Sequence, residues 1–131
     1  MSLKIKLNSV PVDDQEQALQ FYCGTLGFEK KLDIPLGGDF RWLTVVSPDE
    51  PDAAELALEP NAHPAAKTFQ EALHADGIPI TAFAVADINA EYERLLAAGV
   101  VFQGEPADAG GTMLAVFDDT CGNFIQLYEA G

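Results

Sequence analysis

The chain has two cysteines that could carry out thiol chemistry, Cys23 and Cys121. Cys121 lies in the segment DDTCGN, where no neighbour in sequence could serve as its general base and where Asp, Gly and Asn are typical of a turn. We therefore expect Cys121 to be structural rather than nucleophilic. The two cysteines lie far apart and without CxxC spacing, so we expect free thiols rather than a disulfide.

Imidazole chemistry is limited to His63 and His74, which lie in one short segment of the chain. A metal site would require both to reach the same cavity as Glu55 or Glu59. We expect solvated side chains instead, with His74 near a helix C-terminus, where its interaction with the helix dipole is favourable.

The segment FIQLYE near the C-terminus alternates between two kinds of side chain. Ile125 and Leu127 share one face of the expected strand, whereas Phe124, Gln126 and Tyr128 share the other. Ile and Leu suit a core face. An amide between two aromatic residues on the opposite face could orient a polar group of a bound molecule.

The composition restricts the classes of partner. Hydrophobic residues make up 48% of the chain, enough for a folded interior, and 21 acidic against 7 basic residues give a formal net charge of −14. Such a surface repels phosphate backbones and anionic membranes, so we predict no nucleic-acid partner and no membrane partner. The first residues, MSLKIKLNSV, lack the apolar stretch of a signal peptide, and we expect a cytoplasmic protein.

One pattern of secondary structure occurs twice. In LNSVPVDDQEQALQFYCGTLGF an alternating strand leads to Asp13 or Asp14 as a helix cap, followed by a helical apolar stripe and a glycine stop. In ITAFAVADINAEYERLLAAGVVF the same order recurs, with the cap Asp87 lying 73 residues after Asp14. An offset of about half the chain indicates an internal duplication of one unit.

The remainder of each half completes a βαβββ module. We expect short strands near residues 29–33 and 100–103, then a strand pair in RWLTVVSPDEPDAAELALEP and in TMLAVFDDTCGNFIQLYEA, which aligns Trp42 with Met113. The segment NAHPAAKTFQEALHADGIP predicts a connecting helix. The expected fold is α+β, one domain with module one at 1–60, the connecting helix at 61–78 and module two at 79–131.

Two such modules in a chain of this length resemble the vicinal oxygen chelate superfamily, which includes glyoxalase I, bleomycin-resistance proteins, fosfomycin-resistance enzymes and extradiol dioxygenases. The resemblance is carried by VPVDDQEQALQFYCGTLGF in the first module and by FAVADINAEYERLLAAGV and FDDTCGNFIQLYE in the second. It implies that each module curls into half of an open barrel and that the halves meet around a central cavity. In the metal-dependent members, the first and last strands of each module supply the ligands of a divalent ion.

The resemblance places those metal-ligand positions at Leu7, Ala57, Ile80 and Gln126. The family normally has His on the first strand of each module and Glu on the last. Three of the residues found here have no donor atom, and a neutral amide alone is a poor ligand for a divalent ion. We therefore predict no metal and no other cofactor.

Strand parity gives the expected lining of the cavity. The helix-facing core is assigned Leu43, Val45, Leu114 and Val116. The concave side is assigned Ser9, Trp42, Thr44, Ala82, Ala84, Met113, Ala115, Phe124, Gln126 and Tyr128. Because an apolar and aromatic surface with few polar groups suits an organic molecule, we predict ligand contacts from Gln126, Trp42, Thr44, Ser9, Met113, Phe124 and Tyr128. The alternative is that these side chains fill the barrel and leave no cavity.

Two classes of function fit these expectations. The first is binding of a small apolar or aromatic molecule without metal and without reaction, as the resemblance to the bleomycin-resistance branch implies. The alternative is an enzyme, either a metal-dependent lyase of the glyoxalase kind or a dioxygenase, with ligands that the sequence does not identify. A purely structural or regulatory dimer is a third possibility. We also expect a homodimer, because open curved sheets usually cover their edges by pairing.

Overall fold

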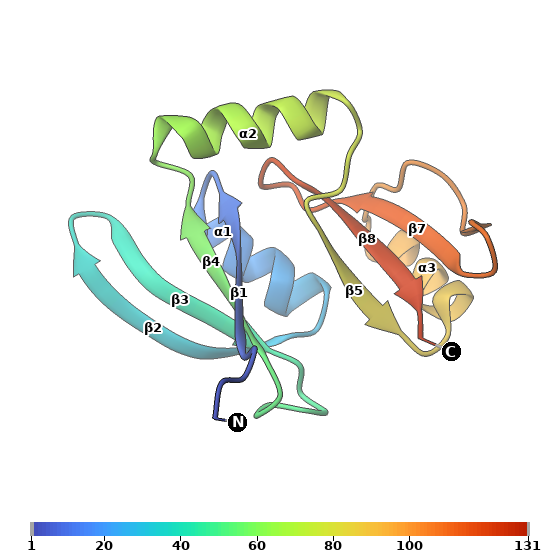
Figure 1. The fold of residues 1–131 in the computed structure, drawn as a ribbon, viewed down its shortest axis with the longest axis horizontal. Helices are drawn as coiled ribbons and strands as arrows, with labels where there is room; N and C mark the ends of the chain where they lie inside the picture. The colour runs from blue at the N-terminus through green and yellow to red at the C-terminus, as the bar shows by residue number, and fades with distance from the viewer. Residues whose placement is uncertain (1, 131) are drawn as a thin grey trace.

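The computed structural model describes residues 2–130, and two four-stranded sheets form its framework (Figure 1). Sheet A has the strand order β1-β4-β3-β2, and sheet B has the order β5-β8-β7-β6. The strands of sheet A are β1 (Leu7–Val12), β2 (Glu29–Gly37), β3 (Phe40–Val46) and β4 (Glu55–Pro60). Those of sheet B are β5 (Thr81–Val85), β6 (Ala107–Asp108), β7 (Met113–Asp118) and β8 (Phe124–Glu129).

The two sheets have the same topology. In each, the first strand runs parallel to the last, β1 with β4 and β5 with β8, whereas the other neighbouring pairs are antiparallel. A helix follows the first strand of each sheet along the chain. The predicted α+β fold of two tandem βαβββ modules is confirmed.

Aspartate caps begin the helix of each module. α1 (Gln15–Leu19) follows Asp14, whose carboxylate accepts a backbone N–H three residues ahead at 3.0 Å. α3 (Ile88–Ala97) follows Asp87, which accepts the equivalent N–H at 3.1 Å. Each cap satisfies a donor that the first helical turn leaves free. Of the two candidate caps in the first module, Asp14 rather than Asp13 is the one used.

The connecting helix α2 (Pro64–Ala75) crosses one end of both sheets (Figure 1). His63 is its N-cap, because Nδ1 of the imidazole accepts the Ala65 N–H at 3.0 Å. Gly77 follows the helix with φ of 70°, a conformation that glycine adopts without steric cost. Within residues 2–130, no helix is both long and apolar enough to span a membrane.

The helix that begins with α1 continues as a π-helical turn, which no pattern in the sequence predicts. Residues Gln20–Thr25 form a π-helical turn, in which the Leu26 N–H bonds to the Phe21 carbonyl at 2.9 Å. The consecutive residues Phe21 and Tyr22 are both buried. The wider turn accompanies two neighbouring aromatic side chains in the core, which a regular 3.6-residue period does not favour.

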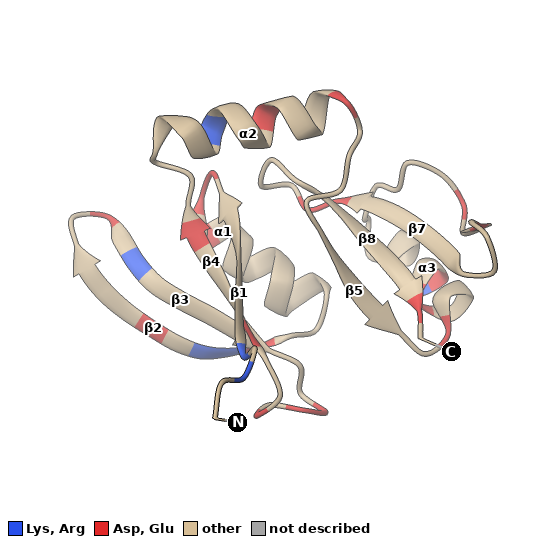
Figure 2. Ribbon diagram, viewed as in Figure 1, with Lys and Arg blue, Asp and Glu red and all other residues tan. Residues whose placement is uncertain are grey.

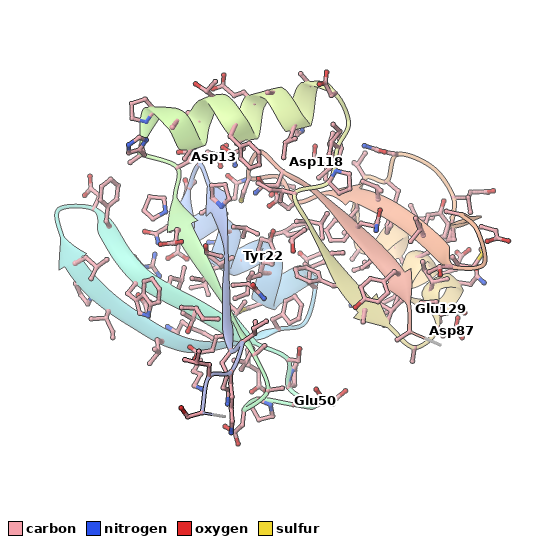
Figure 3. The ribbon with its side chains drawn as sticks, viewed as in Figure 1. Asp13, Tyr22, Glu50, Asp87, Asp118 and Glu129 are labelled. Atoms are coloured by element: carbon pink, nitrogen blue, oxygen red, sulfur yellow. The ribbon has the colours of Figure 1, made fainter. Side chains whose placement is uncertain are left out.

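The two modules share one hydrophobic core. α1 and α3 lie behind the sheets in the view of Figure 1, so each sheet has one face that carries a helix and one that does not. Tyr22 lies between the two sheets (Figure 3), and the rings of Phe28 and Phe83, one from each module, have centroids 5.2 Å apart. The largest fully buried side chains include Tyr22, Phe117, Leu43, Leu58, Ile88, Leu95 and Ile125.

A fully buried carboxylate, Asp119, joins the modules through hydrogen bonds. Its Oδ2 accepts from the Tyr22 hydroxyl at 2.7 Å and from Asn123 Nδ2 at 2.8 Å. Its Oδ1 accepts the backbone N–H groups of Cys121 and Asn123 at 2.7 and 3.0 Å. Burial raises the pKa of Asp119, and the hydrogen bonds from Asn123 and Tyr22 oppose that rise. Gln70 of α2 extends the network by donating to Asn123 Oδ1 at 3.0 Å.

The prediction of a strand near residues 100–103 is wrong, because this segment is not a regular strand. This segment forms an isolated bridge between Phe102 and Phe117, and the strand that pairs with β7 at this edge is β6. Gly104 and Pro106 lie between the two. Proline lacks a backbone N–H and so interrupts a strand ladder. The strand expected near residues 29–33 is confirmed as β2 and continues to Gly37.

Candidate functional site

On the helix-free face of sheet A, Ser9, Ala57 and Thr44 lie in register across three strands. Ala57 and Thr44 are fully buried, whereas Ser9 is exposed. Trp42, two residues before Thr44 on β3, is half-buried on the same side. The Thr44 hydroxyl donates to Glu55 Oε1 at 2.9 Å. This face therefore combines an indole ring with a hydroxyl that a carboxylate holds in place.

On the helix-free face of sheet B, Gln126 lies in register with Ala82 and Val116. Phe124 and Tyr128 flank it along β8, on the same side of the strand. Gln126 and Phe124 are half-buried, and Tyr128 is exposed. This is the parity predicted for β8, with the amide between two aromatic rings.

The predicted parity of β7 is wrong. Val116 pairs with Gln126, so Val116 and Leu114 lie on the helix-free face rather than in the core. Met113 packs against the core, and Ala115 is buried there. Met113 therefore leaves the candidate site, and Leu114 and Val116 take its place.

His74, which we expected to be solvated, contacts the sheet B face. Its ring stacks on Phe124 with centroids 4.4 Å apart and planes 7° from parallel. Its Nε2 lies 3.3 Å from Oδ2 of Asp118, the last residue of β7, and Figure 3 shows Asp118 beneath the end of α2. The amphipathic sequence of α2 does not indicate which sheet the helix crosses, so the sequence carried no signal for this contact.

The remaining predicted site residues lie on two neighbouring surfaces. Sheet A carries Ser9, Trp42 and Thr44, and sheet B carries Phe124, Gln126 and Tyr128. Both helix-free faces turn toward the viewer in Figure 1. Apolar side chains on them are exposed, among them Leu7, Leu32, Ile34, Phe40 and Tyr128. One chain therefore presents two open half-sites side by side.

The residues at the expected metal-ligand positions do not fit a divalent ion. Ala57 and Gln126 occupy equivalent places on β4 and β8, Leu7 is an exposed aliphatic residue on β1, and Ile80 packs against the core. Of the four, only Gln126 has a donor atom. In the part of the chain that the structure describes, no three His, Cys, Asp or Glu side chains gather as they would around an ion.

Cys121 lacks the surroundings of a nucleophile. The residue is fully buried, and burial, assisted by the nearby carboxylate of Asp119, raises the pKa of its thiol to about 12. A thiol that stays protonated at neutral pH and is shielded from solvent is unreactive. Cys23 and Cys121 are both free, as predicted.

Two tandem βαβββ modules with a shared core and helix-free sheet faces define the class of small α+β proteins that includes glyoxalases and bleomycin-resistance proteins. The chain belongs to the Glyoxalase/Bleomycin resistance protein/Dioxygenase superfamily, which it matches over residues 4–127. The family expected from the duplicated segments is confirmed.

The chain is similar to relatives along nearly its whole length. It is 54% identical over 127 residues to the uncharacterized protein YurT of Bacillus subtilis (strain 168). The matched region covers 97% of this chain and 99% of YurT. It is similar to the crystal structure of UcmS2, with 34% identity, a TM-score of 0.83, and coverage of 99% of this chain and 100% of UcmS2. It is also similar to TnmS3, an antibiotic binding protein from Streptomyces sp. CB03234, with 30% identity, a TM-score of 0.77, and coverage of 100% of this chain and 99% of TnmS3.

Proposed function

We propose that this chain binds a small apolar or aromatic molecule on the helix-free faces of its sheets, without a metal ion. The observation that carries this proposal is the setting of Gln126, a lone amide between Phe124 and Tyr128 and in register with Val116. A planar apolar ligand can stack on Tyr128 or on the face of Phe124 that His74 does not cover, and can contact the valine. The amide can orient one polar group of that ligand.

The helix-free face of sheet A supplies the second contact surface in this proposal. Trp42 offers a large apolar ring, and Ser9 offers an exposed hydroxyl. Thr44 is fully buried and its hydroxyl is engaged by Glu55, so it forms the floor of this face rather than a free polar contact. Rigid aromatic anchors with few polar groups are typical of small-molecule sites.

Two considerations favour binding over a metal-dependent lyase or dioxygenase. The donor set at the metal-ligand positions is three aliphatic side chains and one amide. TnmS3, which is similar over nearly its whole length, is an antibiotic binding protein, and this supports an organic ligand here too. The fold alone does not decide the question, because one scaffold can host both functions.

The proposed functional form is a homodimer. Both helix-free faces lie on one side of the molecule and expose apolar side chains such as Ile34 and Phe40, and patches of this kind commonly mark an interface. In a twofold arrangement, sheet A of one copy faces sheet B of the other. Trp42 of one copy would then lie across from Gln126 of its partner, and two equivalent sites would be closed.

Light scattering at micromolar concentration is expected to give twice the chain mass of 14.0 kDa. The physical reason is that the exposed apolar side chains of the two helix-free faces leave water when two copies associate. A single monomer mass across that concentration range would contradict the homodimer, and the ligand would then be bound on open faces.

Replacing Gln126 with alanine is expected to weaken binding of a neutral tricyclic probe, 9-anthracenemethanol, by about fivefold, the loss of one net hydrogen bond. The probe should quench the emission of Trp42, the one tryptophan of the chain, and a fluorescence titration measures both effects. Gln20→Ala, at an exposed glutamine on the first helix, is the matched control and should leave the affinity unchanged. Unchanged Trp42 emission together with unchanged affinity in Gln126→Ala would place the site elsewhere.

A further inference from the structure

A cavity with a volume of about 420 Å³ lies on the helix-carrying side of sheet B, opposite the face that carries Gln126. Its walls are the apolar side chains of Phe28, Phe83, Leu95, Phe117 and Leu127. Phe117, Leu95 and Leu127 are among the buried core residues. Pockets of this size with mainly apolar and aromatic walls are typical of small-molecule sites. We call this cavity the seam pocket, because both modules line it.

The seam pocket is separate from the helix-free face. Phe83 and Leu127 are in register on β5 and β8, and so are their neighbours Ala82 and Gln126. Successive side chains of a strand point to opposite sides of a sheet. Sheet B therefore lies between the wall of the seam pocket at Phe83 and Leu127 and the surface around Gln126.

Arg94 of α3 ties the two modules together at the mouth of the seam pocket. Its Nη2 donates to the Leu26 carbonyl at 3.1 Å and to Glu91 Oε2 at 2.8 Å, and its Nη1 donates to the Thr25 carbonyl at 3.3 Å. These bonds hold the end of the π-helical turn of module one against the helix of module two. The mouth therefore has a defined shape before any ligand enters.

The charges at the mouth select against anions. Besides Arg94, which is paired with Glu91, the lining includes the carboxylates of Asp49 and Asp87. Figure 2 shows acidic residues at the turn between β3 and β4 and at the start of α3, the two segments that carry these carboxylates. An ammonium group at the mouth would meet opposite charge, whereas a carboxylate there would meet repulsion.

We propose that the seam pocket binds a small aromatic amine, with its ring against the apolar wall at Phe28 and Phe83 and its ammonium group at the acidic mouth. This is a second site, independent of the binding proposed on the helix-free faces. The ring would leave water on packing against the apolar wall, and the ammonium group would stay in solvent at the mouth, in the field of its carboxylates.

The test is calorimetric titration of the full chain with naphthalen-1-ylmethylamine and, separately, with 1-naphthoate. The amine should bind saturably, and the naphthoate should bind at least about tenfold more weakly because of the carboxylates at the mouth. Ala90 is an exposed residue of α3 that lines the pocket, and Ala90→Leu should weaken amine binding at least about fivefold by filling the mouth. Ala97→Leu, at an exposed position near the other end of α3, is the matched control and should have no effect.

A second pair of variants separates this site from the helix-free face. Asp49→Asn should reduce the preference for the amine over the naphthoate, and Val116→Asp should leave amine binding unchanged. The proposal is overturned by failure of the amine to bind, by equal binding of the naphthoate, or by full affinity in Ala90→Leu. It is also overturned if Val116→Asp abolishes amine binding, since the amine would then occupy the helix-free face. None of these results bears on the binding of 9-anthracenemethanol.

Discussion

Asp119→Ala is expected to lower the free energy of unfolding by about 3–5 kcal/mol, the range for removing one partner of a buried charged network. The substitution leaves the Tyr22 hydroxyl, the Asn123 amide and two backbone N–H groups without their acceptor, in a site where Asp119 is fully buried. The effect should exceed that of a surface change because this network also joins the modules through Tyr22.

Urea denaturation followed by circular dichroism measures this loss. Asp52→Ala, at an exposed carboxylate in the turn before β4, is the matched control and should change the free energy of unfolding by less than about 0.5 kcal/mol. Tyr22→Phe removes only one donor to Asp119 and should cost about 1–2 kcal/mol. A loss below about 1 kcal/mol for Asp119→Ala would contradict a stabilising role for the network.

Val116→Asp is expected to weaken binding of 9-anthracenemethanol at least about tenfold, which corresponds to about 1.4 kcal/mol. Val116 is half-buried in register with Gln126, so the new carboxylate would lie where the aromatic body of the ligand is proposed to sit. A ligand stacked there would strip water from the charge without giving it a partner. The folded chain should tolerate the change, because the side chain stays near solvent.

Val101→Asp is the matched control for this variant, since Val101 is exposed beside β7 and makes no part of the proposed site. It should bind the probe as the unsubstituted chain does. If sheet faces pair in a homodimer, Val116→Asp should also shift the light-scattering mass toward the monomer, whereas Val101→Asp should not. Equal probe affinities for the two variants would show that the probe does not bind on the helix-free face of sheet B.

The sequence predicts the fold well because two kinds of local signal agree. Asp14 caps the helix of module one, and Asp87 caps the helix of module two. In β8, apolar residues alternate with a face that carries the polar residue Gln126. A strand with Ile125 and Leu127 on one face and an amide on the other has one register that buries its apolar side. The position of Gln126 was therefore predictable from residues alone.

The register of β7 was not predictable in the same way. Its first residues, Met113 to Phe117, are all apolar, so both phases of a period-two pattern fit the sequence equally. Alignment of the two halves did not help, because the offset between them falls from 73 residues at the caps to 69 between Ala57 and Gln126. The misplacement of Met113 follows from this change in loop length.

Contacts between distant segments could not be predicted from the sequence either. His74 stacks on Phe124 only because α2 crosses the end of sheet B, and the seam pocket depends on how the modules pack. Neither arrangement has a local pattern, since each depends on tertiary packing. The π-helical turn at Gln20–Thr25 is a further case, because two buried aromatic neighbours give no helical period.

The central claim is that this chain binds an organic molecule on its helix-free faces without a metal ion. Its most direct test is calorimetric titration with 9-anthracenemethanol of protein that has been treated with chelator and checked by elemental analysis, repeated after adding nickel, zinc, manganese or iron(II). If the claim is right, the probe affinity is the same in every case and none of these ions binds stoichiometrically. Probe binding that appears only with an added ion, or a stoichiometric ion that is lost in Gln126→Ala, would contradict it.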